Sequence, residues 1–338
     1  VRDAVARLDR QIAVQVLPDG GYYERSPSYH CQVLSDLIDV HELLVAAGCT
    51  VSPVLREATT AMRSWLGAML LPDGDVPLFN DAWLIGVDRL RLLDPVEHGD
   101  RPLVVLQPSG YVVARPAEGT VLVADVGPPC PPDLPAHAHA DCLSFVLCVN
   151  GERVIVDTGT STYTPGLVRD YERSTRAHNT VEIDGRDQTE VWGAFRAGRR
   201  ATPTLKAARR TDEHIEICAS HDGYRRLAGR PSHLRTLRVG PSHVAVVDQV
   251  LGGGRHAVSA FLHLAPGLVA RLDEHRRTVQ AGPLTISAGH GPALTLHGPE
   301  TDAGGWVATG FGQRQPAAVV SLNTHADLPV RLTSSIGW

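Results

Sequence analysis

Apolar residues recur at helical spacing through the first quarter of the chain. An opening run advances in steps of three and four residues through Val5, Leu8, Ile12 and Val16. Two later runs each begin with a serine followed by a proline, Ser26-Pro27 and Ser52-Pro53, which suits a helix N-cap and first turn. These patterns predict a helical region over residues 1–95.

From about residue 101 the apolar pattern changes to alternation, which is typical of β-strands. The stretch "VLCVNGERVIVD" (146–157) predicts a hairpin, with Asn150-Gly151 as a type I′ turn. Similar short runs continue to Trp338, so the pattern predicts a large antiparallel β-sandwich over residues 102–338. The stretch "LLDPVEHGDRP" (92–102) contains the expected boundary between the two domains.

Length and charge narrow the classes of function. A chain of 338 residues has room for two ordinary domains, and a net charge of −5 argues against non-specific nucleic-acid binding. No apolar run approaches the length needed to cross a membrane, so we expect neither nucleic acid nor membrane as a partner. Residues 1–20 lack a signal-peptide pattern, but the chain begins with Val and we expect its true N-terminus upstream. No localisation is assigned.

Two histidines one residue apart occur in "AHAHADCLSF" (136–145). In an extended chain His137 and His139 would project from the same face. Asp157 follows the predicted hairpin and His178 lies in "RSTRAHNTV" (173–181). Two imidazoles and a carboxylate form a common Zn²⁺ ligand set. The same spacing also arises without a metal, and Asp157 would equally suit a cap on the turn at Thr158-Gly159.

A tyrosine falls in the first turn of the helix that Pro27 opens. The positive end of a helix dipole stabilises anions, so Tyr29 is expected to ionise more easily than an ordinary phenol. A tyrosine in that position is a candidate proton donor or acceptor. The alternative is an ordinary half-buried aromatic residue at a helix start.

Four stretches together resemble the heparinase II/III-like polysaccharide lyases: "PDGGYYERSPSYHCQVLSDL" (18–37), "LPDGDVPLFNDA" (71–82), "HAHADCLSFVLCVNGERVIVDTGT" (137–160) and "RDYERSTRAHNTVEIDGRDQTEVWGAFRAGRR" (169–200). The likeness spans roughly residues 18–270. It implies a partial α/α toroid followed by a large antiparallel β-sandwich, with residues 1–95 as the last helices of the toroid.

The resemblance also implies an activity and a site. Such lyases cleave anionic, uronic-acid-containing polysaccharide by β-elimination, which requires C5 carboxylate neutralisation, C5 proton removal and protonation of the leaving O4. By resemblance, Tyr29 is the general acid and also a candidate base, while His137 is a base or substrate contact. His139, Asp157 and His178 match the ligands of a metal, usually zinc, with another divalent ion open. The remaining polar motif residues expected to contact substrate are Arg25, His30, Arg173 and Asn179.

One departure from the family and two rival functions stay open. The family carries an Asn-His pair upstream of the tyrosine, and no such pair occurs before Tyr29. We therefore expect the carboxylate-neutralising residues upstream, in a longer protein. The rivals are a metal-dependent cupin-like oxygenase, which also places an H-x-H motif on a β-sandwich, and a non-catalytic carbohydrate-binding or scaffold protein. Neither needs Tyr29.

Overall fold

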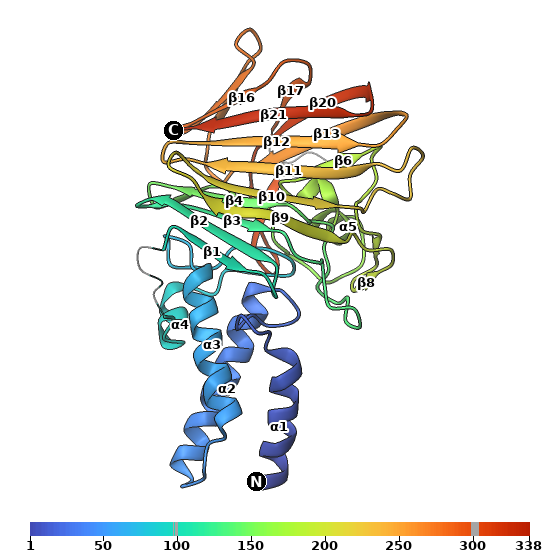
Figure 1. Ribbon diagram of the computed structural model, residues 1–338. Helices are drawn as coiled ribbons and strands as arrows, with labels where there is room; N and C mark the ends of the chain where they lie inside the picture. The colour runs from blue at the N-terminus through green and yellow to red at the C-terminus, as the bar shows by residue number, and fades with distance from the viewer. Residues whose placement is uncertain (97, 99–100, 299–303) are drawn as a thin grey trace.

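The computed structural model describes residues 1–96, 98, 101–298 and 304–338. Three helices project from one end of a large β-region, with the N-terminus at their far tip (Figure 1). They are α1 (Arg2–Gln15), α2 (Pro27–Ala46) and α3 (Pro53–Met69), followed by the short α4 (Val87–Leu92). The described part of the chain contains no helix long and apolar enough to cross a membrane.

Local sequence signals explain where the helices begin. Pro27 and Pro53 occupy the first turns of α2 and α3, as predicted, where a missing backbone N–H costs nothing. The side chain of Ser52 accepts a hydrogen bond from the backbone nitrogen of Leu55 at 3.1 Å, which caps α3. The apolar faces of the helices then meet in one core, which includes Ile12, Leu34, Leu55, Met62 and Leu66.

The β-region is built from three larger sheets and two short hairpins, and every strand pair in the described part is antiparallel. The five-stranded sheet has the order β1 (Leu103–Leu106), β2 (Tyr111–Ala117), β3 (Thr120–Asp125), β4 (Phe145–Val149), β5 (Glu152–Ile155). The eight-stranded sheet has the order β14 (Ala270–Asp273), β15 (Thr278–Ala281), β16 (Leu284–Ala288), β21 (Val330–Gly337), β12 (His243–Leu251), β11 (Ser232–Val239), β10 (Ile215–His221), β9 (Pro203–Arg210).

The four-stranded sheet has the order β17 (Ala293–His297), β20 (Val319–Asp327), β13 (Arg255–His263), β6 (Val181–Ile183). The hairpins are β18 (Trp306–Gly310) with β19 (Gln313–Pro316), and β7 (Val191–Trp192) with β8 (Arg196–Ala197). Helix α5 (Leu167–Glu172) and a 3₁₀ turn, η1 (Thr175–Ala177), lie between β5 and β6.

The predicted order of helices followed by an antiparallel sandwich is confirmed. Three residues of the expected boundary stretch, Glu97, Gly99 and Asp100, lie outside the described residues.

The five-stranded sheet is covered on both faces. One face packs against α3, where Trp65 and Met69 meet Tyr111 and Val123. The other face joins the core that it shares with the eight- and four-stranded sheets. Burial on both faces explains the apolar sequence of β4 and of residues 121–124 in β3, because neither side of these strands meets water. Asn150 and Gly151 both have positive φ, as the predicted hairpin turn between β4 and β5 requires.

Candidate functional site

A single buried carboxylate gathers the side chains at the junction of the helical and β halves. Asp81 lies between α3 and α4 and is fully buried. One of its oxygens accepts hydrogen bonds from His139 Nε2 at 2.8 Å and Thr160 Oγ1 at 3.0 Å. The other accepts from His137 Nδ1 at 3.0 Å, and the guanidinium of Arg169 bonds both oxygens. His137 and His139 therefore point at the same acceptor.

His137 is held between two carboxylates and against a tyrosine ring. Its Nε2 lies 3.0 Å from Glu24 Oε2, while its Nδ1 bonds Asp81. Burial would lower the pKa of His137, but the hydrogen bonds to Asp81 and Glu24 outweigh burial and raise it. The imidazole stacks on the ring of Tyr29 with centroids 4.0 Å apart. The two candidate catalytic groups thus touch directly.

Tyr29 belongs to a pair of tyrosines. Its hydroxyl lies 2.9 Å from that of Tyr163, a hydrogen bond in which either oxygen serves as donor. Its ring meets Trp83 edge-on at 5.2 Å. The expected easing of ionisation is not seen. Burial raises the pKa of Tyr29, and the negative charges of Asp81 and Glu24 add to this against the opposing bond to Tyr163 and charge of Arg169. The phenol is therefore protonated at neutral pH.

Three buried side chains direct unpaired atoms at one another. His139 Nδ1, His178 Nε2 and both carboxylate oxygens of Asp141 have no hydrogen-bond partner in the described part of the chain. Ligand atoms of these three residues lie within 4.8 Å of one another. The opposite nitrogens are fixed, His139 Nε2 by Asp81 and His178 Nδ1 by Asp157 at 2.8 Å. A carboxylate behind each imidazole is the arrangement that orients histidine ligands of metals, so the group fits a divalent ion.

The group of converging ligand atoms contains Asp141 and does not contain Asp157, which the resemblance implied as a ligand. The oxygens of Asp157 are already used, one by His178 and the other by the backbone nitrogen of Gly159 at 3.2 Å. Asp157 therefore caps the turn, which was the alternative interpretation, and also orients a candidate ligand. Burial raises the pKa of the Asp141 carboxyl to about 6. A bound cation would favour the charged form.

Three of the four expected substrate contacts are buried and make structural contacts. His30 is 1% exposed; its Nδ1 accepts from the backbone nitrogen of Tyr22, and its Nε2 bonds the carbonyl of Met62. Arg173 is equally buried and donates to four backbone carbonyls, those of Ala138, Trp192, Gly193 and Arg196.

Asn179 is likewise inaccessible, with its amide bonded to the carbonyls of Phe145 and Val156 and to the backbone nitrogen of His263. In this structure His30, Arg173 and Asn179 hold the backbone around the site and do not face a substrate. Arg25 is only partly buried and donates to the carbonyl of Ser109 at 2.7 Å.

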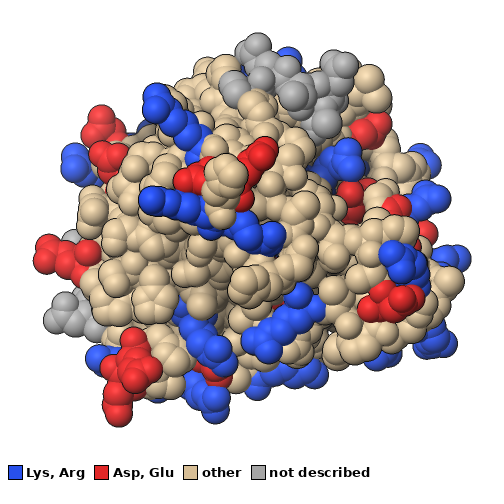
Figure 2. Space-filling model, turned by 90° about the horizontal axis from the view of Figure 1, so that it is seen from above, with Lys and Arg blue, Asp and Glu red and all other residues tan. Residues whose placement is uncertain are grey.

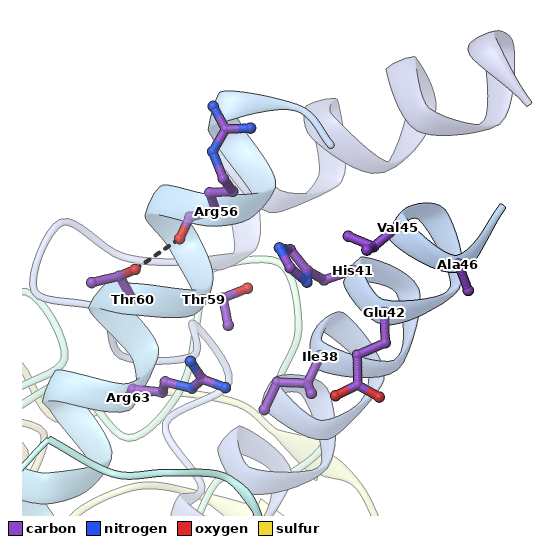
Figure 3. A pocket seen from close by; sticks show the side chains of 9 residues that line it. All are labelled: Ile38, His41, Glu42, Val45, Ala46, Arg56, Thr59, Thr60 and Arg63. Carbon is purple, nitrogen blue, oxygen red and sulfur yellow. Dashed lines mark hydrogen bonds between the residues drawn. The ribbon is translucent and has the colours of Figure 1, made fainter. Parts of the chain in front are cut away.

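A separate pocket of about 540 Å³ lies between α2 and α3 (Figure 3). It is lined by side chains such as His41, Glu42, Arg56 and Arg63. Its nearest residue on α2, Ile38, is nine positions beyond Tyr29, which corresponds to about 14 Å along a helix axis. The pocket contains none of the candidate catalytic or metal-ligating residues.

The fold agrees with comparisons against known proteins. A family model described as "Heparinase II/III-like, C-terminal" matches residues 98–338, and one described as "Heparinase II/III N-terminus" matches residues 1–92. The chain belongs to the heparinase II/III family. It is 23% identical, over 95% of its length, to a heparin-sulfate lyase of Bacteroides stercoris, and this match covers 50% of that relative.

Solved structures of heparinases share the fold. The chain is similar to a heparinase III, the BT4657 gene product, with a TM-score of 0.83, 20% identity and coverage of 99% of this chain and 55% of that one. It is also similar to the heparan sulfate lyase HepC of Pedobacter heparinus, with a TM-score of 0.81, 16% identity and coverage of 98% and 55%. The chain thus spans about half the length of the heparinase relatives that it matches.

Four residues of the candidate site were missed by the sequence reasoning. Asp81, Glu24 and Asp141 all lie inside the motifs that carry the family likeness, and an acidic residue in such a motif is a signal that could have found them. Tyr163 lies just outside those motifs, in a loop after β5. Its bond to Tyr29 depends on tertiary structure, and no local pattern indicates it.

Loss of the buried ion pair of Asp81 should cost more stability than loss of an exposed ion pair. Asp81→Asn leaves Arg169 buried without its counter-charge, so we expect the free energy of unfolding to fall by about 3–5 kcal/mol. The matched control is Asp73→Asn, because Asp73 also joins the two halves by pairing with Arg153 but is more exposed. That change should cost less than about 1 kcal/mol. Urea unfolding measures both, and equal losses would contradict the special role of Asp81.

Acid should destabilise the protein partly through His30. Burial lowers the pKa of the folded-state imidazole to about 3, whereas the unfolded chain titrates near 6.5. The unfolded state therefore binds more protons, and stability is lost as the pH falls from about 6.5 towards 3. His30→Gln should make the loss shallower by up to about 1.4 kcal/mol per pH unit. Urea unfolding at several pH values, with exposed His290→Gln as control, tests this; parallel curves for H30Q and parent would contradict it.

Proposed function

We propose that the protein is a polysaccharide lyase that cleaves an anionic, uronic-acid-containing polysaccharide by β-elimination. The observation that carries the proposal is the contact between Tyr29 and His137, which come from different halves of the chain and stack at 4.0 Å. Family membership supports the same reaction class. The names of the relatives, heparin-sulfate lyase and heparan sulfate lyase, make heparan-type chains the first substrates to test.

The proton positions suit elimination. Tyr29 is protonated at neutral pH, so its phenol is ready to donate to the O4 that leaves. His137 is anchored through Nδ1 to the buried Asp81, which leaves Nε2 as the nitrogen that meets the uronate. In the free protein Nε2 bonds Glu24, whose side chain is 14% exposed and is the group that a substrate would displace. Through this nitrogen the protonated His137 would contact the substrate, and in its neutral form, with Glu24 displaced, it would serve as base.

Polyanion recognition in this proposal is local. The face seen in Figure 2 shows basic and acidic side chains interspersed, with no dominant field of one sign. At the junction of the halves, by contrast, Arg25 and Arg169 lie near the candidate catalytic groups. Arg169 is neutralised by Asp81, so in this proposal a charged substrate would meet Arg25, which is only partly buried.

The geometry favours a lyase over a cupin-like oxygenase. In a cupin both histidines of the H-x-H motif would bind one ion. Here both nitrogens of His137 bond carboxylates, and the candidate metal group contains His139 without His137. The contact between His137 and Tyr29 has no purpose in a cupin.

We further propose that His139 Nδ1, His178 Nε2 and Asp141 hold a divalent ion, with Zn²⁺ the preferred occupant because imidazole and carboxylate form a common zinc set. When bound, the ion would supply positive charge to the buried, unpaired lone pairs of these atoms and would fix the segment that carries His137. The chain's own residues prepare that site, because Asp81 and Asp157 orient the two imidazoles.

Tyr29→Phe should abolish cleavage. The substitution removes the proton donor and keeps the ring that stacks on His137, so we expect kcat to fall by at least about 100-fold. Ultraviolet absorbance of the new C4=C5 double bond, with a panel of uronate polymers, measures the reaction. Tyr23→Phe, which changes a nearby tyrosine outside the Tyr29–Tyr163 pair, is the control. An active Y29F enzyme, or a parent that makes no unsaturated product, would contradict the proposal.

Zinc binding should depend on Asp141 more than on Asp157. The metal-free protein should bind one zinc ion and gain about 2.7 kcal/mol of stability at a free zinc concentration 100 times the Kd. Asp141→Asn removes a ligand and should abolish this gain. Asp157→Asn disturbs only the orientation of His178 and should weaken binding about 10- to 100-fold. Calorimetric titration measures both, and the reverse order would make Asp157 the ligand.

A further inference from the structure

An open pocket of about 840 Å³ lies beside the tyrosine pair. Its walls are the loop from Ser161 to Val168 and the turn of the β18–β19 hairpin, which carries Phe311. Tyr163 lines this pocket and at the same time bonds the hydroxyl of Tyr29. The volume lies in the range of small-ligand sites. A polymer that reaches Tyr29 would have this pocket next to the reacting sugar.

Hydrogen bonds join the loop and the hairpin that form the pocket to each other and to the buried carboxylate of Glu172. The backbone nitrogen of Gly312 donates to the carbonyl of Ser161 at 2.8 Å. Glu172, which is fully buried, accepts from the backbone nitrogen of Ser161 at 3.0 Å and from the indole of Trp306 at 3.3 Å. The hairpin also reaches the helical half, where Leu84 donates to the carbonyl of Thr309 at 3.2 Å. The pocket is therefore a formed part of the junction between the halves.

The side chains that face the pocket suit a charged sugar. Phe311 is 49% exposed, although its ring meets Tyr163 at 4.8 Å and Trp83 at 5.9 Å. A half-exposed aromatic ring provides a flat apolar surface for the C–H face of a sugar. Arg314 is exposed, its guanidinium lies 5.1 Å from the ring centroid of Trp306, and no carboxylate in the described part of the chain pairs with it. Among the described residues its charge therefore has no carboxylate partner and can pair with an anionic group of a ligand.

We infer that this pocket is a subsite for the sugar residue next to the cleaved uronate. Phe311 stacks on the ring of that sugar, and Arg314 pairs with its negatively charged substituent, a carboxylate or a sulfate. The inference rests on the proposed lyase function for the presence of the polymer. The inference assigns the choice of substrate to the β18–β19 hairpin and the catalytic step to Tyr29 and His137. Substitutions in the hairpin should therefore change the affinity for substrate without changing the rate of the catalytic step.

Binding is tested in the Tyr29→Phe background, which should hold substrate without turnover. The probes are size-defined tetrasaccharides, one sulfated and of heparan sulfate type and one unsulfated with the same backbone. Calorimetry should show that Arg314→Gln raises the Kd at least about fivefold. Phe311→Ala should raise it for both probes. Arg210→Gln, an exposed arginine on the edge strand β9, is the control and should leave the Kd unchanged.

The two probes distinguish the charged groups. An effect of Arg314→Gln on the sulfated probe alone identifies sulfate as the partner, and an equal effect on both identifies the carboxylate. With Tyr29 present, Arg314→Gln should raise KM and leave kcat within twofold, which a merely structural loss would not do. Unchanged binding by both Arg314→Gln and Phe311→Ala, or no binding by the Y29F parent, would overturn the subsite. A lack of cleavage by the wild-type protein alongside the expected Kd changes would instead overturn the lyase function and leave the subsite standing.

Discussion

The buried charge of Asp81 sets the arrangement of everything around it. Burial opposes ionisation of this carboxyl, but the bonds from His137, His139 and Arg169 hold its pKa well below the ordinary range. Taking a carboxylate out of water costs several kcal/mol, and only well-placed donors offset that cost. Asp81 follows the last long helix, whereas all its side-chain donors come from the β half. The two halves therefore have one relative position in which the charge is satisfied.

The segment between α3 and α4, which carries Asp81, also positions Tyr29. The hydroxyl of Ser28, in the first turn of α2, donates to the carbonyl of Trp83 at 2.7 Å and accepts from the nitrogen of Trp83 at 2.8 Å. Tyr29 thus follows directly after Ser28, which is hydrogen-bonded to the segment that carries Asp81. The acceptor that orients His137 and the start of the helix that carries Tyr29 belong to one local unit. This explains how residues more than a hundred positions apart come to stack.

The fold was predictable because it depends on local periodicity and turn chemistry. The change from helical spacing to alternation follows from which faces are buried, and the Asn150-Gly151 turn needs only two residues that tolerate positive φ. The site was predictable only in part. Motif spacing indicated His137 and His139 as site residues, but it carries no information on how deeply a side chain is buried. Buried polar residues such as His30 were therefore expected to contact substrate. Whether a motif residue meets backbone or solvent is decided by packing between distant segments.

The helix N-terminus and the surrounding side chains act in opposite directions on the pKa of Tyr29, and the effect of tertiary packing is the larger. A helix N-terminus stabilises an anion by about 0.3–1 kcal/mol at an exposed position. Enclosure against His137 and Trp83, with two carboxylates nearby, acts in the other direction, and burial is the larger effect. The phenol therefore keeps its proton. For the proposed elimination this is the useful state, because the proton that O4 requires would already be on the protein before the substrate arrives. The bond to Tyr163 holds the hydroxyl in a defined direction.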